Sequence, residues 1–395
     1  MLVNDQYAYC LVEGNRVINV KEKSSFTDHR MSEFASNGIY YFRNGAILKK
    51  YFEKLMDEGP SLNGEFYCSL VFQHMVDDGL KVNTFLVDYM LQWGTPKDLS
   101  IYQYWSDYFS EFVKNGLPSG IPHNALLLLP MAGYGSRFSQ EGYCSPKPML
   151  DINDGPMFAQ AVRCLPPTNE IAFVCLEEHL RSFDLESIVV DWFENARIIS
   201  ICKPTDGQAS TCALALAQLQ NSEDRPLYIS ACDNGVHYDE LIHQGLIDDP
   251  SVDVVVWSFR NNPTVLANPD MYSWLDVDSR GNVKNVSCKK FPFDDPMACH
   301  AIVGTMFFRK SSYFLDAYAE NRAKSIVTNG EYYVDDVINR CIERGLVVKV
   351  FEVRHYICWG TPNDYKTYKY WQSFFEKCEW HDYSMNNDPL SHKTQ

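Results

Sequence analysis

Short apolar runs alternate with helical patterns between about residues 124 and 269. The apolar runs at 125–131, 171–176, 197–202, 227–232 and 252–258 are rich in Val, Ile and Leu and have the length of strands. Helical patterns occur at 157–164 and 209–219. Strands that are apolar throughout are typical of a sheet that is covered on both faces. The pattern therefore predicts an α/β fold with a doubly wound, mostly parallel sheet.

The chain also contains an internal repeat. Shifting it by 266 positions places residues 17–105 on 283–371 with 28 identities in 89 positions, too many for chance. Each copy is predicted to form a hairpin, a strand, two helices, a strand and a final helix; the strands lie at 38–42 and 82–87 in the first copy and at 304–308 and 348–353 in the second. The motif W-G-T-P-x-D occurs in both copies. We interpret it as a helix start, because Thr suits the N-cap, Pro the first helical position and Asp the first turn.

The first copy has no room for the front half of such a domain. We therefore predict a partial domain at 1–112, a Gly- and Pro-rich linker at 113–121, a complete domain at 122–376 and a polar tail at 377–395. In the complete domain 143 residues (124–266) precede the position that matches Met1. We expect a similar stretch to be missing ahead of Met1, so that the chain is a fragment of a longer tandem protein or is completed by a partner.

Composition narrows the functional classes. The 395 residues are 46% hydrophobic and 22% charged, as in ordinary soluble globular proteins, and the length suits two or three domains. The longest apolar stretch, 125–132, is far below the ~20 residues that span a bilayer, and no secretory signal begins the chain, so we expect a cytoplasmic protein without membrane insertion.

The net charge of −16 argues against nucleic-acid binding. Thirteen cysteines without a C-x-x-C pair indicate neither a zinc site nor a disulfide framework. Homo-oligomerisation is left open.

A glycine-bearing loop carries the candidate chemistry. The sequence P-M-A-G-Y-G-S-R-F at 130–138 follows the first strand of the complete domain, and S-P-K-P follows at 145–148. Glycine lets backbone N–H groups approach phosphate oxygens, and Arg and Lys add charged donors. The loop lacks the third glycine of a dinucleotide-binding fingerprint and the Gly-Lys-Ser/Thr of a P-loop.

Together these two segments resemble the signature of the sugar-phosphate nucleotidyltransferases, also called nucleoside-diphosphate-sugar pyrophosphorylases. The residues of these two segments are most similar to those of bacterial members linked to capsule and surface-polysaccharide synthesis. The resemblance covers 122–376 in full and 1–112 as the trailing half. It implies a Rossmann-like nucleotidyltransferase domain that uses Mg²⁺, takes a nucleoside triphosphate and a sugar 1-phosphate or related phosphate, and releases pyrophosphate.

The resemblance also implies roles for particular residues. Arg137 would hold the leaving phosphates, Lys147 would neutralise charge at the α-phosphorus, and Asp233, at the end of a predicted strand, would bind Mg²⁺. The second Mg²⁺ ligand would be Asp336, with Asp335 as the alternative. The nucleotide would be bound by residues of the glycine loop and of the segment 204–211: Ala132, Gly133, Gly135, Ser136, Gly207, Gln208 and Ser210.

The sugar-phosphate site is where the chain departs from the family pattern. The resemblance implies that Lys289, Gly304 and Glu331 contact the sugar phosphate. Family members often have the pair Glu-Lys at the position that binds the sugar phosphate. The first copy has this pair at 22–23, but the complete domain has Cys288 before Lys289. The identity of the sugar therefore cannot be transferred by analogy.

Other interpretations stay open. Asp233 could cap a turn, Lys147 could be a surface lysine, and Gln208 and Ser210 could simply begin a helix. A glycosyltransferase would keep an Asp-x-Asp pair, whereas C-D-N at 232–234 supplies one acid. A nucleotide-sensing or scaffolding module would need no chemistry at all. The sequence does not identify the base.

Overall fold

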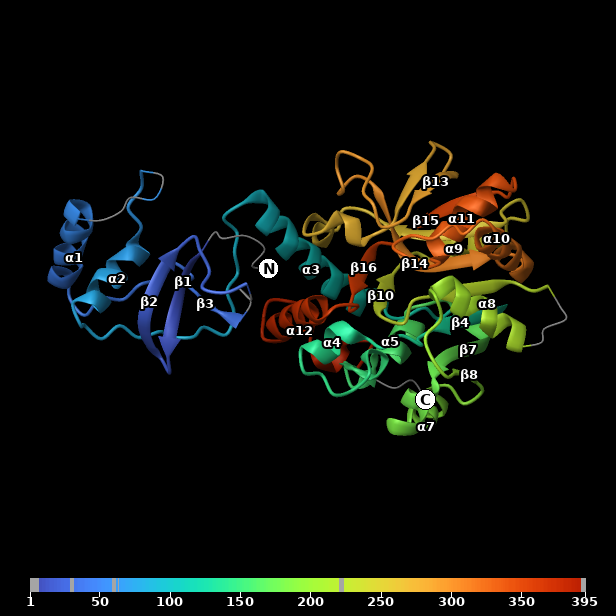
Figure 1. The fold of residues 1–395 in the computed structure, drawn as a ribbon, viewed down its shortest axis with the longest axis horizontal. Helices are drawn as coiled ribbons and strands as arrows, with labels where there is room; N and C mark the ends of the chain where they lie inside the picture. Colours follow the sequence, from blue (N-terminus) through green and yellow to red (C-terminus); the bar gives the residue numbers. More distant parts are fainter. Residues whose placement is uncertain (1–6, 29–31, 59–61, 63, 220–223, 392–395) are drawn as a thin grey trace. The chain divides into compact units, whose positions relative to one another are not determined.

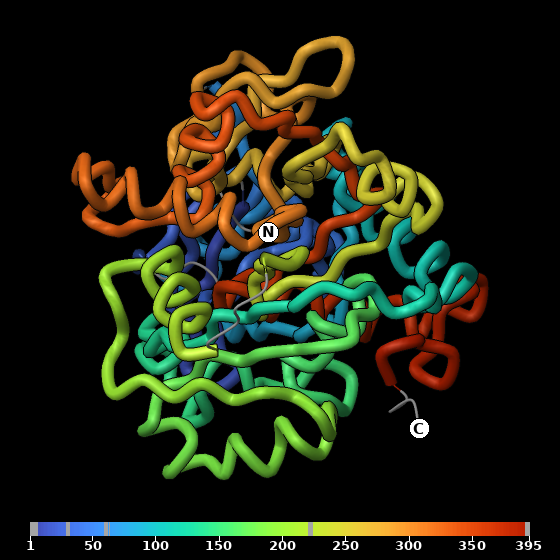
Figure 2. Tube along the Cα trace, turned by 90° about the vertical axis from the view of Figure 1, so that its right-hand side faces the viewer, coloured from blue at the N-terminus to red at the C-terminus, as the bar shows by residue number. Residues whose placement is uncertain are grey.

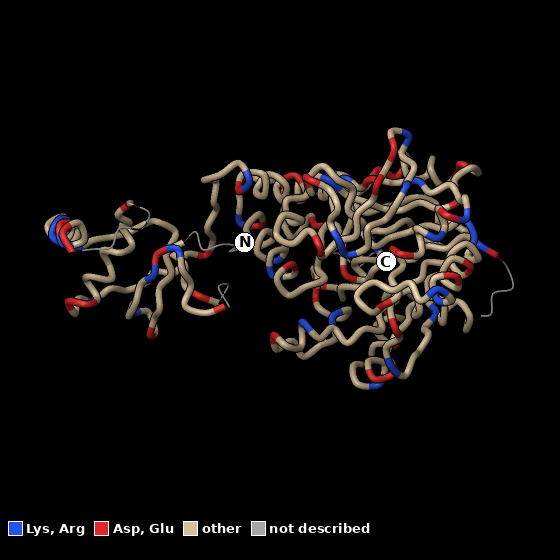
Figure 3. Tube along the Cα trace, turned by 45° about the horizontal axis from the view of Figure 1, so that its top comes forward, with Lys and Arg blue, Asp and Glu red and all other residues tan. Residues whose placement is uncertain are grey.

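The computed structural model describes residues 7–28, 32–58, 62, 64–219 and 224–391 (Figure 1). The chain divides between Gln92 and Trp93 into two compact units, which we call the N-terminal and C-terminal units. Lys and Arg are interspersed with Asp and Glu along the chain (Figure 3). Within the described residues no helix is long and apolar enough to cross a membrane. All thirteen cysteines are free thiols, and six of them are buried.

The N-terminal unit is a small three-stranded sheet packed on two helices. The hairpin of β1 (Ala8–Glu13) and β2 (Arg16–Glu22) pairs with the short β3 (Phe34–Ala35) in the order β2-β1-β3. The helices are α1 (Gly45–Glu58) and α2 (Cys68–Asp77). Val17 and Val20 of β2 pack against residues of both helices. The buried core consists of Val17, Val20, Tyr51, Leu55, Val71, Met75 and Val82.

The two further strands predicted in this unit do not form. Residues 38–42 and 84–87 are irregular, and Asn83 makes only an isolated bridge to Arg16. Ile39, Tyr41 and Phe85 are 81%, 86% and 91% exposed. In the C-terminal unit the matching strands pair with neighbours at 227–230 and 254–259, whereas the described residues of the N-terminal unit contain no strand in these places. Residues 82–84 still bond to the hairpin, through Val17 N to Val82 O at 2.9 Å and Thr84 N to Asn15 O at 2.8 Å, but neither segment forms a strand.

The C-terminal unit contains a nine-stranded mixed sheet. Its centre is parallel and runs in the order β8 (Arg197–Ile201), β7 (Thr168–Leu176), β4 (His123–Pro130) and β9 (Leu227–Ser230). Next to β9 the antiparallel β14 (His300–Phe308) joins this centre to the strands β11 (Val254–Phe259), β12 (Trp274–Val277), β13 (Val283–Ser287) and β15 (Val348–Glu352). The prediction of an α/β fold with a mostly parallel central sheet is confirmed.

Helices cover both faces of this sheet (Figures 1 and 2). Leu126 and Leu128 of β4 face a core that includes α8 (Gln208–Gln218), α10 (Ser311–Ala323) and α11 (Val334–Glu343). The opposite face packs on α5 (Met157–Arg163), whose Phe158 contacts Phe173, and on α9 (Glu240–Asp248). Both faces are apolar, which explains the continuous Leu run of β4.

The C-terminal unit also contains several short elements. These are α4 (Ser136–Gln140), α6 (Glu177–Ser182), α7 (Leu185–Trp192), the short strands β5 (Asp151–Ile152) and β6 (Gly155–Pro156), and the 3₁₀ turns Lys147–Met149, Pro263–Leu266, Pro269–Met271 and Met385–Asn387.

The helix α3 (Pro96–Asn115) belongs to the C-terminal unit, so the boundary lies before the predicted residue 112. Its apolar stripe packs on α12 (Pro362–Glu376), where Trp105 stacks on Trp371 with ring centroids 6.4 Å apart. Burial of these large rings fixes the helix there. The helix extends to Asn115, and the predicted linker therefore begins within it. Both W-G-T-P-x-D motifs start a helix as predicted, with Thr95 and Thr361 as N-caps.

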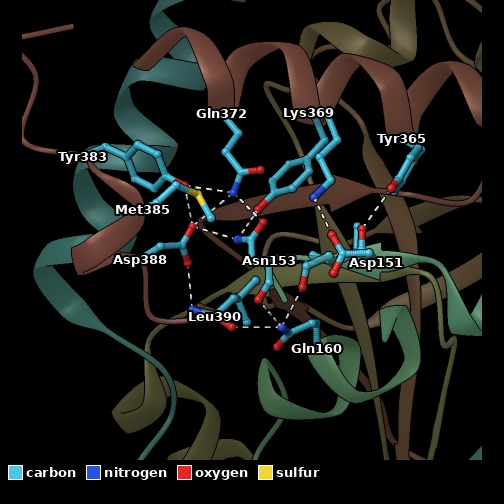
Figure 4. Close-up of polar contacts among 12 residues, drawn as sticks. Asp151, Asn153, Gln160, Tyr365, Lys369, Gln372, Tyr383, Met385, Asp388 and Leu390 are labelled. Atoms are coloured by element: carbon cyan, nitrogen blue, oxygen red, sulfur yellow. Dashed lines mark hydrogen bonds and ion pairs between the residues drawn. The ribbon is translucent and has the colours of Figure 1, made fainter. Parts of the chain in front are cut away.

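The C-terminal segment is not the polar tail that its composition predicts. Tyr383, Asp388 and Leu390 are at most 2% exposed. Figure 4 shows the polar contacts that hold this segment against α5 and α12. Asp388 Oδ2 accepts hydrogen bonds from Tyr383 Oη at 2.6 Å and from Asn153 Nδ2 at 2.7 Å, while its Oδ1 accepts one from Leu390 N at 2.7 Å. Gln160 Nε2 donates to the carbonyl oxygen of Leu390 at 2.9 Å.

We expect Asp388→Asn to destabilise the C-terminal unit. Burial raises the pKa of the Asp388 carboxyl, but every group that surrounds it is a hydrogen-bond donor. Asparagine would turn an NH₂ group toward one of these donors, at a cost of about 1 to 3 kcal/mol in the free energy of unfolding. Urea denaturation measures this change. Asp382→Asn, in the exposed part of the same segment, is the control and should shift the free energy by less than about 0.5 kcal/mol. Equal effects of the two changes would contradict the role of the network.

Candidate active site

The glycine loop lies where β4 ends and α4 begins. Gly133 and Ser136 are exposed, whereas Ala132 is buried. Gly133 has open space where a side chain would stand. Gly135, the residue before α4, has a φ of +63°, and a Cβ there would lie 3.1 Å from Lys147 Cβ. Glycine at 135 therefore supplies both the left-handed turn and the close approach of the segment that carries Lys147.

Lys147 and Asp233 form an ion pair across the end of the sheet. Lys147 lies between two buried prolines, and Asp233 follows β9. Lys147 Nζ is 2.6 Å from Asp233 Oδ2, and each side chain is about a quarter exposed, at 23% and 24%. Burial lowers the pKa of Lys147, but the Asp233 carboxylate outweighs this effect, and the pKa lies above that of an ordinary lysine. The two groups lie together at the carboxyl edge of the parallel strands, where ligands of open α/β sheets bind.

A second carboxylate, which the sequence interpretation missed, lies near this pair. Burial raises the pKa of Asp364 and the Asp233 carboxylate adds to this, whereas the Arg137 guanidinium lowers it. Asp364 Oδ2 accepts a hydrogen bond from Thr361 Oγ1 at 2.6 Å, as the helix-start motif requires. A Cβ at Gly360 would lie 2.8 Å from Asp233 Oδ2. The second W-G-T-P-x-D motif is therefore both a helix start and one wall of the site.

Asp336 and Asp335 have other partners. Asp336 Oδ2 accepts a hydrogen bond from Thr328 Oγ1 at 2.8 Å, and Asp335 Oδ2 accepts one from Ser273 Oγ at 2.5 Å. Burial raises the pKa of Asp336, and the Asp335 carboxylate adds to this. These contacts favour Asp364 over Asp336 as the carboxylate beside Asp233.

The segment predicted to recognise the base is held against the loop before α11. Gly207 has a φ of +140°, and a Cβ there would lie 2.4 Å from Tyr332 N. Backbone hydrogen bonds hold Tyr332 on either side of Gly207. Tyr332 N donates to Asp206 O and Ala209 N donates to Tyr332 O, each at 2.9 Å. Only glycine can occupy position 207 in this arrangement.

The two polar residues after Gly207 differ in their surroundings. Gln208, the first residue of α8, is half-buried. Ser210 is buried, and its hydroxyl accepts a hydrogen bond from Tyr318 Oη at 2.8 Å and donates one to Asp206. Ser210 therefore holds the segment in place, whatever contact it makes with a nucleotide.

Two of the three predicted sugar-phosphate residues lie together. Lys289 Nζ is 5.5 Å from the centre of the Tyr333 ring, and the Tyr333 hydroxyl hydrogen-bonds Glu331. Gly304, with a φ of +96°, instead accepts a backbone hydrogen bond from Ala231 N at 3.1 Å. It therefore borders the segment that carries Asp233.

The N-terminal unit contains a matching cluster. Lys23 donates to the Tyr67 hydroxyl, and Tyr67 donates to Glu65. The shift of 266 relates these three residues to Lys289, Tyr333 and Glu331. The two units thus share the local arrangement of a lysine, a tyrosine and a glutamate.

Over about three fifths of its length, the chain is similar in fold to solved nucleotidyltransferases. A nucleoside-diphosphate-sugar pyrophosphorylase from Vibrio cholerae RC9 is 22% identical, with 61% of this chain and 98% of that chain covered and a TM-score of 0.51. A UDP-glucose pyrophosphorylase, solved with UDP-glucose, is 17% identical, with 65% and 100% covered and a TM-score of 0.50. No protein-family model and no curated relative matches the chain. The chain therefore has a Rossmann-like fold shared with known nucleotidyltransferases.

Proposed function

We propose that the C-terminal unit is a Mg²⁺-dependent nucleotidyltransferase. It transfers a nucleoside monophosphate from a nucleoside triphosphate to a sugar 1-phosphate, or to a related alcohol phosphate, and releases pyrophosphate. The product would be an activated sugar for capsule or surface polysaccharide. The observation that carries this proposal is the ion pair of Lys147 and Asp233, which joins the segment 145–148, packed against the glycine loop, to the segment after β9.

The proposed reaction is an in-line displacement. A phosphate oxygen of the sugar 1-phosphate forms a bond to the α-phosphorus, and the bond from that phosphorus to the bridging oxygen of pyrophosphate breaks. Such transfers depend on positioning and charge neutralisation rather than on a protein nucleophile. Backbone N–H groups at Gly133, Gly135 and Ser136 would hold the triphosphate, and Arg137 would hold the β- and γ-phosphates. Lys147 would balance the negative charge at the α-phosphorus.

The carboxylates of this region suit the metal. Mg²⁺ prefers one or two carboxylates together with phosphate oxygens and water. Asp233 and Asp364 offer such oxygens, and the Asp233 carboxylate is close enough to raise the pKa of Asp364. When bound, Mg²⁺ would neutralise phosphate charge and orient the triphosphate. We propose Asp233 as a ligand and Asp364 as the second carboxylate, in place of Asp336.

The function is tested by pyrophosphate release. The purified protein is incubated with Mg²⁺ and each of the four nucleoside triphosphates, against a panel of sugar 1-phosphates and alcohol phosphates. We expect release with one preferred pair. Stabilisation by a nucleotide in a thermal-shift assay, without release for any pair, would instead favour a nucleotide sensor.

The metal ligands are distinguished by three asparagine variants. Asp233→Asn should raise the Mg²⁺ concentration for half-maximal rate by about tenfold or more, and Asp364→Asn should raise it to a similar extent. Asp336→Asn is the matched control, since its carboxylate contacts Thr328. A Mg²⁺ titration of the initial rate separates these cases. If Asp336→Asn shifts the curve and Asp364→Asn does not, the original prediction of Asp336 is right.

We further propose that the N-terminal unit is a partial copy of the same domain. The sequence repeat and the shared cluster of Lys23, Glu65 and Tyr67 support this proposal.

A further inference from the structure

Three potential metal ligands meet at the far end of a two-stranded ribbon in the C-terminal unit. The ribbon consists of β10 (Asn234–His237) and β16 (His355–Cys358), and Glu111 of α3 packs against it. Glu111 Oε2 is 3.7 Å from His237 Nδ1 and 3.9 Å from His355 Nδ1. One nitrogen or oxygen from each of the three side chains lies within 4.8 Å of the other two.

The fold brings these groups together. β10 and β16 are antiparallel, and their register places His237 directly opposite His355. The two imidazole rings are nearly parallel, at 17°, with centroids 5.9 Å apart. On the side of α3, the Tyr108 ring packs against His355 and the Phe112 ring packs against His237. The imidazoles are thus held by packing on rigid elements.

The polar atoms of this cluster lack hydrogen bonds. His237 and His355 are only 6% and 8% exposed, and His237 Nδ1, His355 Nδ1 and Glu111 Oε2 are buried without a hydrogen-bond partner. Buried polar atoms nearly always have a partner, so three unsatisfied atoms that face one another require an explanation. Each of them is an atom that can ligate a metal.

We propose that Glu111, His237 and His355 bind a divalent transition-metal ion, with Zn²⁺ as the best fit. Two imidazoles and a carboxylate suit Zn²⁺ and not Mg²⁺, which prefers oxygen ligands alone. Bonds of about 2.0 to 2.2 Å place tetrahedral ligand atoms a little over 3 Å apart, so a bound ion would draw the three atoms closer together than they now lie.

The site would have a structural role distinct from the proposed chemistry. Asn234, at the other end of the ribbon, directly follows Asp233, and Trp359 N, just beyond β16, donates to Asp233 O at 2.9 Å. A metal bound by Glu111 would fasten α3 to the ribbon that carries this end of the active site. A pocket lined by Asn115, Pro118, His237 and Arg354, among others, opens beside the cluster and gives an ion a route of entry.

The proposal is tested by titrating chelator-treated full-length protein with Zn²⁺ in a calorimeter and with Co²⁺ in a spectrophotometer. The variants are Glu111→Gln and His355→Gln. The controls are His123→Gln, a half-buried histidine outside the cluster, and Asp233→Asn, which removes the proposed Mg²⁺ ligand. We expect one equivalent of Zn²⁺ to bind to the wild type and to both controls, with affinity at least tenfold lower in the two cluster variants. Co²⁺ should give visible d–d absorption without a thiolate charge-transfer band.

Several outcomes would overturn the site. These are the absence of Zn²⁺ binding by the wild type, equal affinity in the cluster variants, loss of binding in Asp233→Asn, and a thiolate band with Co²⁺. Circular dichroism verifies the fold of each variant. If His355→Gln does not fold, Glu111→Gln decides the question, since that side chain is 43% exposed and glutamine keeps its shape.

Discussion

Replacing Lys147 with methionine is expected to lower kcat/KM for pyrophosphate release by about 10²- to 10³-fold, as the loss of one preorganised charge-stabilising group typically does. The Lys147 ammonium is held beside Asp233 by the ion pair and by the two buried prolines that flank it. In the proposed reaction its charge would interact most strongly with the transition state, in which negative charge builds up around the α-phosphorus. The loss should therefore fall mainly on kcat rather than on KM.

The control for this change is Lys284→Met. Lys284 also pairs with an aspartate, Asp278, at 2.9 Å, but on the exposed edge of the sheet. Surface pairs of this kind contribute little, so activity and stability should remain near those of the wild type. Steady-state kinetics of both variants, with far-ultraviolet circular dichroism to verify folding, measure the difference. A folded Lys147→Met enzyme within a few-fold of the wild-type rate would remove Lys147 from the mechanism.

Gly207→Ala is expected to lower the free energy of unfolding by about 2 to 5 kcal/mol, since it combines backbone strain with overpacking. The φ of +140° at this position is rarely adopted by residues with a side chain, and the new Cβ would lie 2.4 Å from Tyr332 N and 2.5 Å from Tyr332 O. The clash involves backbone atoms, so rotation of a side chain cannot relieve it. The segment 204–211 would have to separate from the loop before α11, and nucleotide affinity should fall as well.

Gly245→Ala is the matched control for this second prediction. Gly245 lies within α9 and has nothing within 4 Å of the added Cβ, so alanine there should stabilise by about 0.5 to 1 kcal/mol. Chemical denaturation and nucleotide-induced thermal shifts measure both variants. A Gly207→Ala protein as stable as the wild type would show that the contact with Tyr332 is dispensable.

The central sheet could be predicted from the sequence because its strands carry their own signal. The Leu run of β4 and the apolar runs of β7 and β9 are long, continuous and bounded by turns, and both faces of the sheet are covered. Lys147 and Asp233 are 86 residues apart, yet they meet, because the loop after β4 and the end of β9 lie at the same edge of a parallel sheet. The family resemblance pointed to both residues, and the topology of the sheet explains why they meet.

Three features were beyond prediction, each because it depends on a partner distant in the sequence. Asp364 was interpreted only as part of a helix start, since nothing local shows that β16 carries it back to Asp233. The strands predicted at 38–42 and 82–87 had the right composition, but these segments do not have the neighbouring strands that their counterparts pair with in the C-terminal unit. Asp388 lies in a polar segment, and its donor Asn153 is 235 residues away in the sequence.

The contact between α3 and α12 has a further consequence. The sequence shift of 266 relates Trp105 to Trp371 and Phe109 to Phe375. Trp105 stacks on Trp371, and the ring centroids of Phe109 and Phe375 lie 5.6 Å apart. Two residues of α3 therefore each meet their own counterpart.

The contacts between unlike residues are reciprocal. The ring centroids of Tyr102 and Trp371 lie 6.1 Å apart. Those of Trp105 and Tyr368, the counterpart of Tyr102, lie 6.3 Å apart. Such exchange of partners defines an isologous interface, in which a two-fold axis relates equal surfaces. The helix pair thus reproduces within one chain the geometry of a homodimer contact. Because α3 already occupies this face of α12, the same face is closed to the α12 of a second molecule.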